Sequence, residues 1–496
     1  MLFNSLQFLI FLPIVLLLYY TLPQKIRYLW LLAASYYFYM CWNASYALLI
    51  FFSTVVTWGC GLILEHAKQI GGVHLVRNKR ICLAISCVLN FGVLFFFKYC
   101  NFALVNLTRL FTLLHIELNL PVVDVLLPVG ISFYTFQAVS YTIDVYRDDI
   151  YAEKNFFRYA LFVSFFPQLV AGPIERSKNL LKQLAVPTKL KFDNLRDGLL
   201  LMIWGFFLKV VIADRASVFV DTVYGDLTTY SGWYFIIATL FFAVQIYCDF
   251  SGYSVIAMGA AKMLGIDLML NFDAPYFSSS TAEFWRRWHI SLSSWFRDYL
   301  YIPLGGNRKG KLRKYLNLLI TFAVSGLWHG AQWSYVAWGT LNGMYQIIGD
   351  ILKPLRMRLA RLLYINPESL GSRVVKVLFT FTLIDFSWIF FRADRFVSAF
   401  TIIKSILTVH NPWILFDGSL YECGLSQKTF SMLVCAIILL LLADLLKLKK
   451  VCIRQIIEQQ DYWCQILIIA CSICAVMLFG MYGPGFDAAS FIYFQF

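Results

Sequence analysis

The chain has 496 residues, of which 60% are hydrophobic, 18% are aromatic and only 14% are charged. A soluble protein of this size could not keep so much apolar surface away from water, so the composition predicts a polytopic membrane protein. The formal net charge of +14 is better explained by basic cytoplasmic loops than by nucleic-acid binding. No basic run is interleaved with the aromatic side chains expected of a soluble nucleic-acid groove.

The first half of the chain contains long apolar runs separated by short polar turns. We predict membrane spans over residues 6–22, 28–64 with a break near 41–43, 81–97 and 102–115. No basic segment precedes the first run and no small-residue cleavage site follows it, so we expect a retained span rather than a signal peptide. Residues 127–137 contain Pro, Gly, Ser, Thr and Gln, which predicts a broken or re-entrant helix lining a cavity.

The second half continues this pattern of apolar runs. Further spans are predicted over residues 162–172, 199–212, 233–250, 318–348, 374–391, 430–446 and 463–481, with a short amphipathic piece at 400–409. The runs together predict an all-α membrane protein with about eleven spans plus re-entrant pieces. Because no soluble domain, internal repeat or low-complexity linker is visible, we expect a single membrane domain over residues 1–496.

Lysine and arginine residues predict the orientation in the cell membrane. The basic segments are residues 25–27, 68–80, 178–191, 308–314 and 356–361. Since cytoplasmic loops are enriched in Lys and Arg, we expect all of these segments in the cytoplasm and the N-terminus outside. The 308–314 loop would also attract an anionic acyl donor, although the orientation rule alone explains its charges equally well.

One uncharged run places a histidine deep in the membrane. Residues 318–348 carry no charged side chain and are long enough for a spanning helix of about 20 residues. His329 lies about 15 Å into this run if the helix is straight. An ionisable side chain at that depth predicts a functional site, whereas a neutral histidine that hydrogen-bonds between helices is the structural alternative.

Residues 283–299 predict an amphipathic helix. Its aromatic ridge consists of Trp285, Trp288, Leu292, Trp295 and Tyr299. A second face carries Arg287, Ser291, Ser294 and Asp298, and His289 is flanked by both faces. This pattern is typical of a helix at or just below the membrane interface, and an interfacial anchor without a catalytic role would show it too.

The candidate chemistry is general base catalysis by a buried histidine. The sequence has no G-x-S-x-G, P-loop or H-E-x-x-H motif, and the C-x-x-C pair at 471–474 lies in an apolar helix, so we predict neither a metal site nor a redox site. Burial disfavours a charged imidazole, so we expect His329 to be neutral and able to accept a proton. Candidate donors to an oxyanion are Arg287, Trp288 and His289.

Several motifs resemble the membrane-bound O-acyltransferase family. They are residues 284–291 (FWRRWHIS) with 328–330 (WHG), 128–137 (PVGISFYTFQ), 166–168 (FPQ) with 171–174 (AGPI), and 249–253 (DFSGY). The set is most similar to the bacterial branch that contains alginate O-acetylases and the D-alanyl transferase of teichoic acid. The chain ends, 1–5 (MLFNS) and 491–496 (FIYFQF), are similar to the alginate O-acetylase subgroup. The resemblance covers nearly the whole chain.

This resemblance implies a ring of helices around a central tunnel, with His329 as the catalytic histidine and His289 as a second motif residue that positions the donor or tunes the base. It implies transfer of an acyl group, expected to be acetyl, from a cytoplasmic thioester such as acetyl-CoA. The expected acceptor is a hydroxyl group on an extracellular polysaccharide or on a secreted or anchored acetyltransferase partner. No permanently bound cofactor is expected. Candidate substrate-contacting residues are Trp285, Arg287, Trp288, Asp298, Trp328, Gln245 and Asp249.

Two other classes of protein fit the composition. A transporter or channel would also have many spans and broken helices, but it predicts related halves, which this sequence lacks. A catalytically silent scaffold of an export complex would keep its function after removal of His329. Asp249 and Asp298 need partners in such aromatic surroundings, and Arg287 or Arg297 could supply them in a structural role. The acceptor could be alginate, cellulose, another exopolysaccharide or a wall polymer.

Overall fold

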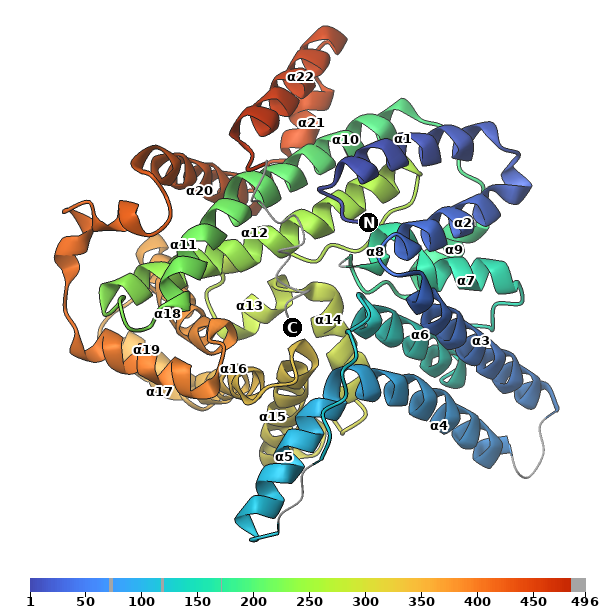
Figure 1. The fold of residues 1–496 in the computed structure, drawn as a ribbon, viewed down its shortest axis with the longest axis horizontal. Coiled ribbons are helices and arrows are strands. Elements are labelled where there is room, and N and C mark those ends of the chain that lie inside the picture. Colours follow the sequence, from blue (N-terminus) through green and yellow to red (C-terminus); the bar gives the residue numbers. More distant parts are fainter. Residues whose placement is uncertain (71–74, 117–119, 171, 483–496) are drawn as a thin grey trace. The chain divides into compact units, whose positions relative to one another are not determined.

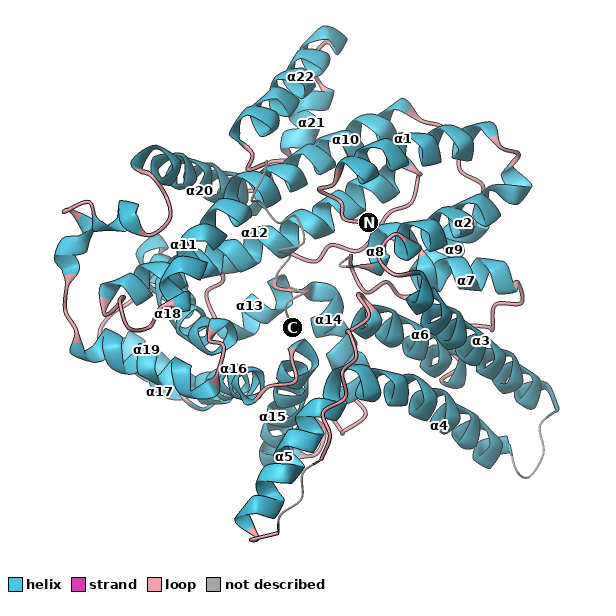
Figure 2. Ribbon diagram, viewed as in Figure 1, coloured by secondary structure: helices cyan, strands magenta, loops and turns pink. Residues whose placement is uncertain are grey.

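The computed structural model describes residues 1–70, 75–116, 120–170 and 172–482. These residues form helices and loops and no β-strand, as Figure 2 shows. Within the same residues, 6 helical segments are long and apolar enough to cross a membrane. The predicted all-α membrane architecture is therefore confirmed. The number of spans near eleven and the central tunnel stay predictions.

The chain folds into two compact units. The first unit comprises Met1–Met202 and Tyr253–Met269, and the second comprises Ile203–Gly252 and the described residues from Leu270 onward. The helices that begin in the first unit are α1 (Leu6–Thr21), α2 (Arg27–Met40), α3 (Ala47–Ile70), α4 (Leu75–Leu94), α5 (Cys100–Leu113), α6 (Ile131–Tyr146), α7 (Phe156–Ser164), α8 (Phe166–Leu169), α9 (Ser177–Ala185) and α10 (Phe192–Phe206). The prediction of a single domain stays a prediction.

The second unit contains most of the motif residues. Its helices are α11 (Asp214–Gly225), α12 (Trp233–Met263, whose last turns belong to the first unit), α13 (Thr281–Arg287), α14 (Ile290–Phe296), α15 (Gly310–His329), α16 (Trp333–Ile351), α17 (Lys353–Leu362), α18 (Leu370–Arg392), α19 (Phe396–Thr408), α20 (Gln427–Leu448), α21 (Ile453–Glu458) and α22 (Tyr462–Phe479). Among the described residues, π-helical turns also occur at Phe207–Ala213 and Arg297–Tyr301 in this unit and at Phe95–Tyr99 in the first unit.

Two predicted spans of the first unit are one continuous helical segment. Residues 81–97 and 102–115 were expected as separate spans on either side of Lys98, but α4 continues through the π-helical turn into α5, over Leu75–Leu113. The reason is that a single lysine does not interrupt the backbone hydrogen bonds, and a π-turn accommodates an irregular position without ending the helix. The break predicted at 41–43 is confirmed, since α2 ends at Met40 and α3 begins at Ala47.

The polar segment at 127–137 begins a helix. Gly130 adopts a left-handed conformation (φ 75°), and α6 starts at the next residue. A Cβ atom at Gly130 would lie 2.5 Å from the carbonyl oxygen of Leu169, so only glycine fits this turn. Gln137, further along this helix, has a partner inside the protein, because its side-chain amide donates to the carbonyl of Phe162 at 2.6 Å.

A buried ionic cluster ties the π-helical turn Phe207–Ala213 to α12 in the second unit. Lys209 lies 2.8 Å from Asp214 and 2.6 Å from Asp249, and the three side chains are only 1%, 2% and 3% exposed. Gly252 permits this close approach, because a Cβ atom there would meet the Gly205 carbonyl at 2.8 Å. Asp249 therefore pairs with a lysine that the sequence pattern did not indicate, instead of with Arg287 or Arg297.

Candidate active site

His329 lies at the end of a helix. The uncharged run 318–348 was expected to be one straight span, but α15 ends at His329, Gly330 is extended (φ −158°, ψ 146°), and α16 begins at Trp333. The prediction of a single helix is therefore wrong. Its physical reason is local, since glycine ends a helix easily and the absence of charge does not reveal such a break. The His329 side chain is nevertheless buried, with 3% exposure.

Glycines let α15 and α16 pack closely side by side, which fixes the position of His329 (Figure 1). A Cβ atom at Gly326 would collide with the backbone carbonyl of Tyr335. A Cβ atom at Gly339 would collide with the carbonyl of Phe322 and come within 3.0 Å of Gly326. Both clashes involve backbone atoms, which cannot rotate away as a side chain can. Gly326 and Gly339 thus set the distance between the two helices.

The substitution Gly339→Ala is expected to destabilise the protein by about 1–3 kcal/mol, because α16 must move away from α15. Acyl transfer should fall as well, since the movement displaces His329. Gly349→Ala on the same helix is the matched control, because nothing lies within 4 Å of its Cβ position. That substitution should be neutral or stabilise by up to about 1 kcal/mol. Thermal unfolding of both variants in detergent measures the difference, and equal melting temperatures would contradict the argument.

The segment 283–299 is two short helices joined by a sharp turn at His289. The expected continuous helix is wrong, because α13 ends at Arg287 and α14 begins at Ile290, while His289 adopts the left-handed conformation (φ 42°, ψ 56°). Histidine is among the non-glycine residues enriched in this region. The predicted interfacial ridge is therefore interrupted, and Trp285, Trp288, Leu292 and Trp295 are all buried inside the protein.

Asn271 holds the turn at His289. The amide N–H of Ile290 donates to the Asn271 backbone carbonyl at 2.9 Å, and the hydroxyl of Ser291 donates to the Asn271 side-chain oxygen at 2.6 Å. Both groups belong to the first turn of α14, where backbone N–H groups lack partners within the helix. Asn271 comes from a loop that precedes α13, so sequence spacing alone could not associate it with His289.

The turn and the helix end bring the two motif histidines together. The ring centroids of His289 and His329 lie 6.3 Å apart, and His289 is 0% exposed. Aromatic rings surround the pair: Phe250 lies 4.6 Å from His289, while Trp338 and Phe391 lie 5.1 Å and 5.6 Å from His329. The two residues are 40 positions apart in the chain yet share one buried aromatic enclosure.

Trp338 is a site residue that the sequence pattern did not reveal. Its ring contacts His329, stacks on Trp388 at 5.5 Å with an interplanar angle of 20°, and lies 5.6 Å from Trp285. Its indole N–H is buried and has no hydrogen-bond partner among the described residues. A buried tryptophan N–H usually has a partner, so a free donor beside a histidine is available to a ligand. The sequence feature that could have pointed to Trp338 is its position in the uncharged run that contains His329.

The other predicted tryptophans belong to the same aromatic cluster. Trp328 lies 5.0 Å from His329 and 6.2 Å from His289. Trp288 contacts Trp388 at 5.2 Å, and the indole N–H of Trp285 donates to the Asn342 side chain at 3.3 Å. Trp328 is thus adjacent to both histidines. Trp285 packs on Trp338, and Trp288 packs on Trp388.

The charged candidates form ion pairs. Arg287 bonds to Glu283 at 2.9 Å, one turn earlier in α13, and Asp298 bonds to its neighbour Arg297 at 2.8 Å. Asp249 belongs to the buried cluster with Lys209 described above. These contacts give all three side chains structural partners, as expected for charged groups in apolar surroundings.

Gln245 differs from the charged candidates. It is buried on α12, and its side-chain oxygen has no hydrogen-bond partner in the described part of the chain. The ranges that the structure covers contain no group of three or more His, Cys, Asp or Glu residues able to hold a metal ion. Cys471 and Cys474 lie exposed on α22 as free thiols.

Comparison with known proteins gives a consistent set of relatives. Residues 152–387 match the model of the membrane-bound O-acyltransferase family, a region that contains both histidines. The chain is 42% identical to the probable alginate O-acetylase AlgI of Pseudomonas putida, over 80% of this chain and 78% of the relative. It is 34% identical to a peptidoglycan O-acetyltransferase of Helicobacter pylori, over 82% and 80% of the two chains. It is 30% identical to a teichoic acid D-alanyltransferase of Streptococcus thermophilus, over 53% and 67%.

Proposed function

The chain belongs to the membrane-bound O-acyltransferase family, and from this premise we propose that it transfers an acetyl group from a cytoplasmic thioester to a hydroxyl group on an extracellular polysaccharide or partner protein. The protein is an integral membrane O-acyltransferase. The observation that supports the finer proposal is the buried pair of His289 and His329, whose rings lie 6.3 Å apart. Its relatives include a probable alginate O-acetylase and a peptidoglycan O-acetyltransferase, which supports a polysaccharide as the acceptor.

His329 acts as the general base in this proposal. A ring nitrogen of the neutral imidazole accepts the proton of the acceptor hydroxyl as its oxygen attacks the thioester carbonyl. The C–O bond forms, the tetrahedral intermediate collapses, the C–S bond breaks, and the leaving thiolate takes the proton from the imidazolium. The Trp338 N–H is a candidate donor to the oxyanion of that intermediate, because it is buried beside the base without a partner among the described residues.

His289 is the second histidine of the site and acts by positioning the donor or tuning the base. We expect His289→Asn to keep the fold, because asparagine tolerates the left-handed conformation, and to lower acyl transfer by about 10²-fold through misplacement. His289→Ala should lower transfer equally and cost about a further 1 kcal/mol of stability. Thermal unfolding and transfer assays on both variants test this. Full activity of His289→Asn would show that the imidazole of His289 is not needed for acyl transfer.

The donor is expected to bind from the cytoplasm. The basic loop at 308–314 precedes α15 and would attract an anionic thioester such as acetyl-CoA. The acceptor is expected on the opposite side, where a secreted or anchored acetyltransferase partner would carry the group onward to the polysaccharide. No permanently bound cofactor takes part in this scheme.

The deciding experiment uses the purified protein in nanodiscs with radiolabelled acetyl-CoA. Loss of the thioester and appearance of label on an added hydroxyl acceptor are followed together. Transfer of label supports the proposal for both donor and reaction. Label that stays on acetyl-CoA in the presence of acceptor and partner protein would show that the donor is another acyl thioester or an acyl carrier protein.

A further inference from the structure

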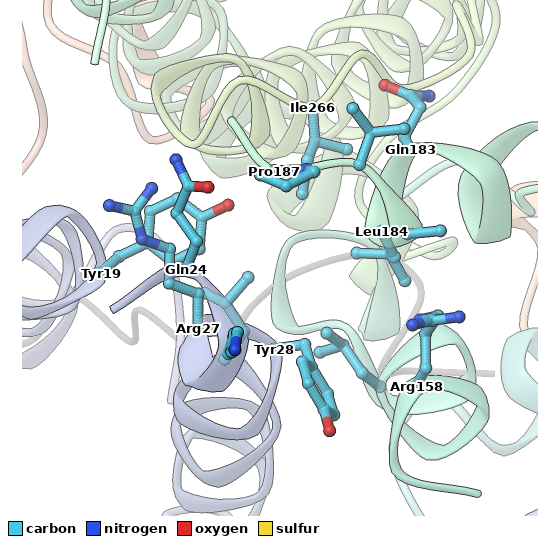
Figure 3. Close-up of a pocket in the computed structure, with 14 residues that line it drawn as sticks. Tyr19, Gln24, Arg27, Tyr28, Arg158, Gln183, Leu184, Pro187 and Ile266 are labelled. Carbon is cyan, nitrogen blue, oxygen red and sulfur yellow. The ribbon is translucent and has the colours of Figure 1, made fainter. Parts of the chain in front are cut away.

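A cavity of about 460 Å³ lies in the first unit, at the turn between α1 and α2 (Figure 3). The turn itself, the start of α2, α7, and the end of α9 with the segment after it supply most of its walls. None of the residues discussed above as candidates for catalysis lines it. The cavity therefore needs an explanation of its own.

The polar part of the cavity is positively charged. Lys25, Arg27 and Arg158 line it, and the lining residues include no aspartate or glutamate. Arg27 is fixed by its bonds to backbone carbonyls, among them that of Thr188 at 2.6 Å. Arg158 contacts Glu153 at 3.4 Å, and its buried Nε has no hydrogen-bond partner within the described ranges. Three cations around one hollow favour an anionic ligand.

Much of the remaining wall is apolar. The apolar lining residues are Leu31, Leu161, Leu184, Ala185, Val186, Pro187 and Ile266, and two tyrosines and two glutamines complete the lining. In Figure 3, Pro187, Ile266 and Leu184 lie across the hollow from Tyr28. A small inorganic anion gains nothing from such walls, whereas an amphiphile that carries a phosphate group contacts both kinds of surface.

The orientation predicted from the basic segments places this cavity at the level of the lipid headgroups. The segments 25–27 and 178–191 were independently predicted to be cytoplasmic. The structure joins them, because the Tyr19 hydroxyl lies 2.7 Å from the Thr188 hydroxyl and Arg27 bonds to the same residue. Anionic lipids give the cytoplasmic surface its negative potential, and basic clusters there attract them.

We propose that the cavity binds the phosphate-bearing headgroup of an anionic phospholipid from the cytoplasmic leaflet. Lys25 and Arg158 contact the phosphate oxygens, Arg27 adds positive charge from the wall, and the apolar side chains contact the glycerol backbone and the start of the acyl chains. The ligand ties the α1–α2 turn to the segment after α9. This binding site is separate from the proposed acyl-transfer chemistry and does not depend on it.

The test compares variants of the full chain purified in detergent. Lys25→Gln removes an exposed cation of the lining, and Ala185→Phe fills the cavity without changing its charge. Lys189→Gln is the matched control, since Lys189 is an exposed lysine of the same predicted cytoplasmic region that does not line the cavity. The probes are phosphatidylglycerol, phosphatidylcholine and inorganic phosphate, and the readouts are retained lipid in native mass spectrometry and the lipid-dependent shift in melting temperature.

We expect phosphatidylglycerol to be retained and to raise the melting temperature of the wild type and of Lys189→Gln. Removal of one lining cation should weaken this binding about fivefold. Ala185→Phe should abolish it, while its melting temperature without lipid shows that the variant is folded. Equal binding by Lys25→Gln and Lys189→Gln, or equal effects of phosphatidylcholine, would overturn the proposal. Stabilisation by inorganic phosphate as large as that by phosphatidylglycerol would overturn the assignment to a lipid.

Discussion

Replacing His329 with alanine is expected to lower acyl transfer by about 10²- to 10⁴-fold, the range that a general base contributes. The side chain is buried at the end of α15 and enclosed by Trp328, Trp338 and Phe391. The ring centroid of His289 lies 6.3 Å away, which is too far for that imidazole to take the place of the lost base. The assay follows label from the acyl thioester to the hydroxyl acceptor.

The variant His329→Gln separates chemistry from packing. Glutamine fills much of the same space and keeps hydrogen-bonding groups, but it cannot accept the proton at neutral pH. It should therefore melt close to the wild type and be as inactive as His329→Ala. His410→Ala provides a control, because His410 is exposed and follows α19 far from the motif residues in sequence. Transfer by His329→Gln at the wild-type rate would disprove the assignment of the base.

Replacing Lys209 with methionine is expected to destabilise the protein by about 3–5 kcal/mol, because removing one partner leaves buried charges without compensation. Asp214 and Asp249 would then face each other with less than a tenth of either side chain exposed. The cluster also fixes the position of Asp249 on α12. The residue after it, Phe250, packs on His289 with 4.6 Å between the ring centroids. We therefore expect reduced acyl transfer together with the lower melting temperature.

Two further variants make this prediction specific. The triple variant Lys209→Met, Asp214→Asn and Asp249→Asn removes all three charges. It should recover much of the lost stability, since replacing a whole buried ion cluster often leaves the free energy of unfolding unchanged. Lys314→Met breaks an ion pair with Asp350 whose side chains are 34% and 44% exposed, so it should cost about 1 kcal/mol or less. Similar losses of stability for Lys209→Met and Lys314→Met would show that the buried cluster contributes no more to stability than an exposed ion pair.

Composition and local pattern determined much about this protein from the sequence alone. The apolar content predicted an all-α membrane protein, and the spans at α12, α18, α20 and α22 were found because a helix across a bilayer needs a continuous apolar run. The two histidine motifs were recognised as residue strings, and comparison with relatives confirmed the family they indicate. These features are local, so they can be read without knowing which segments meet.

The helix break at His289 and the position of His329 against its neighbouring helix were decided by tertiary structure. His289 adopts its left-handed conformation because Asn271, from outside the helix, bonds to the first turn of α14. α15 ends locally at the extended Gly330, but the position of His329 beside α16 depends on the close packing of Gly326 against Gly339, which is a property of two helices together. Periodicity describes one segment at a time, and it therefore predicted unbroken helices at both places.

The surroundings of the site were also decided by the tertiary structure. Trp338 and Phe391 reach His329 from α16 and α18, and Lys209 reaches Asp249 from a different helical turn. In a chain with 46 phenylalanines and 14 tryptophans, no local signal distinguishes the rings that enclose His329 from those that face lipid. Which aromatic rings pack together depends on which helices lie side by side, and the order of residues along the sequence does not show this.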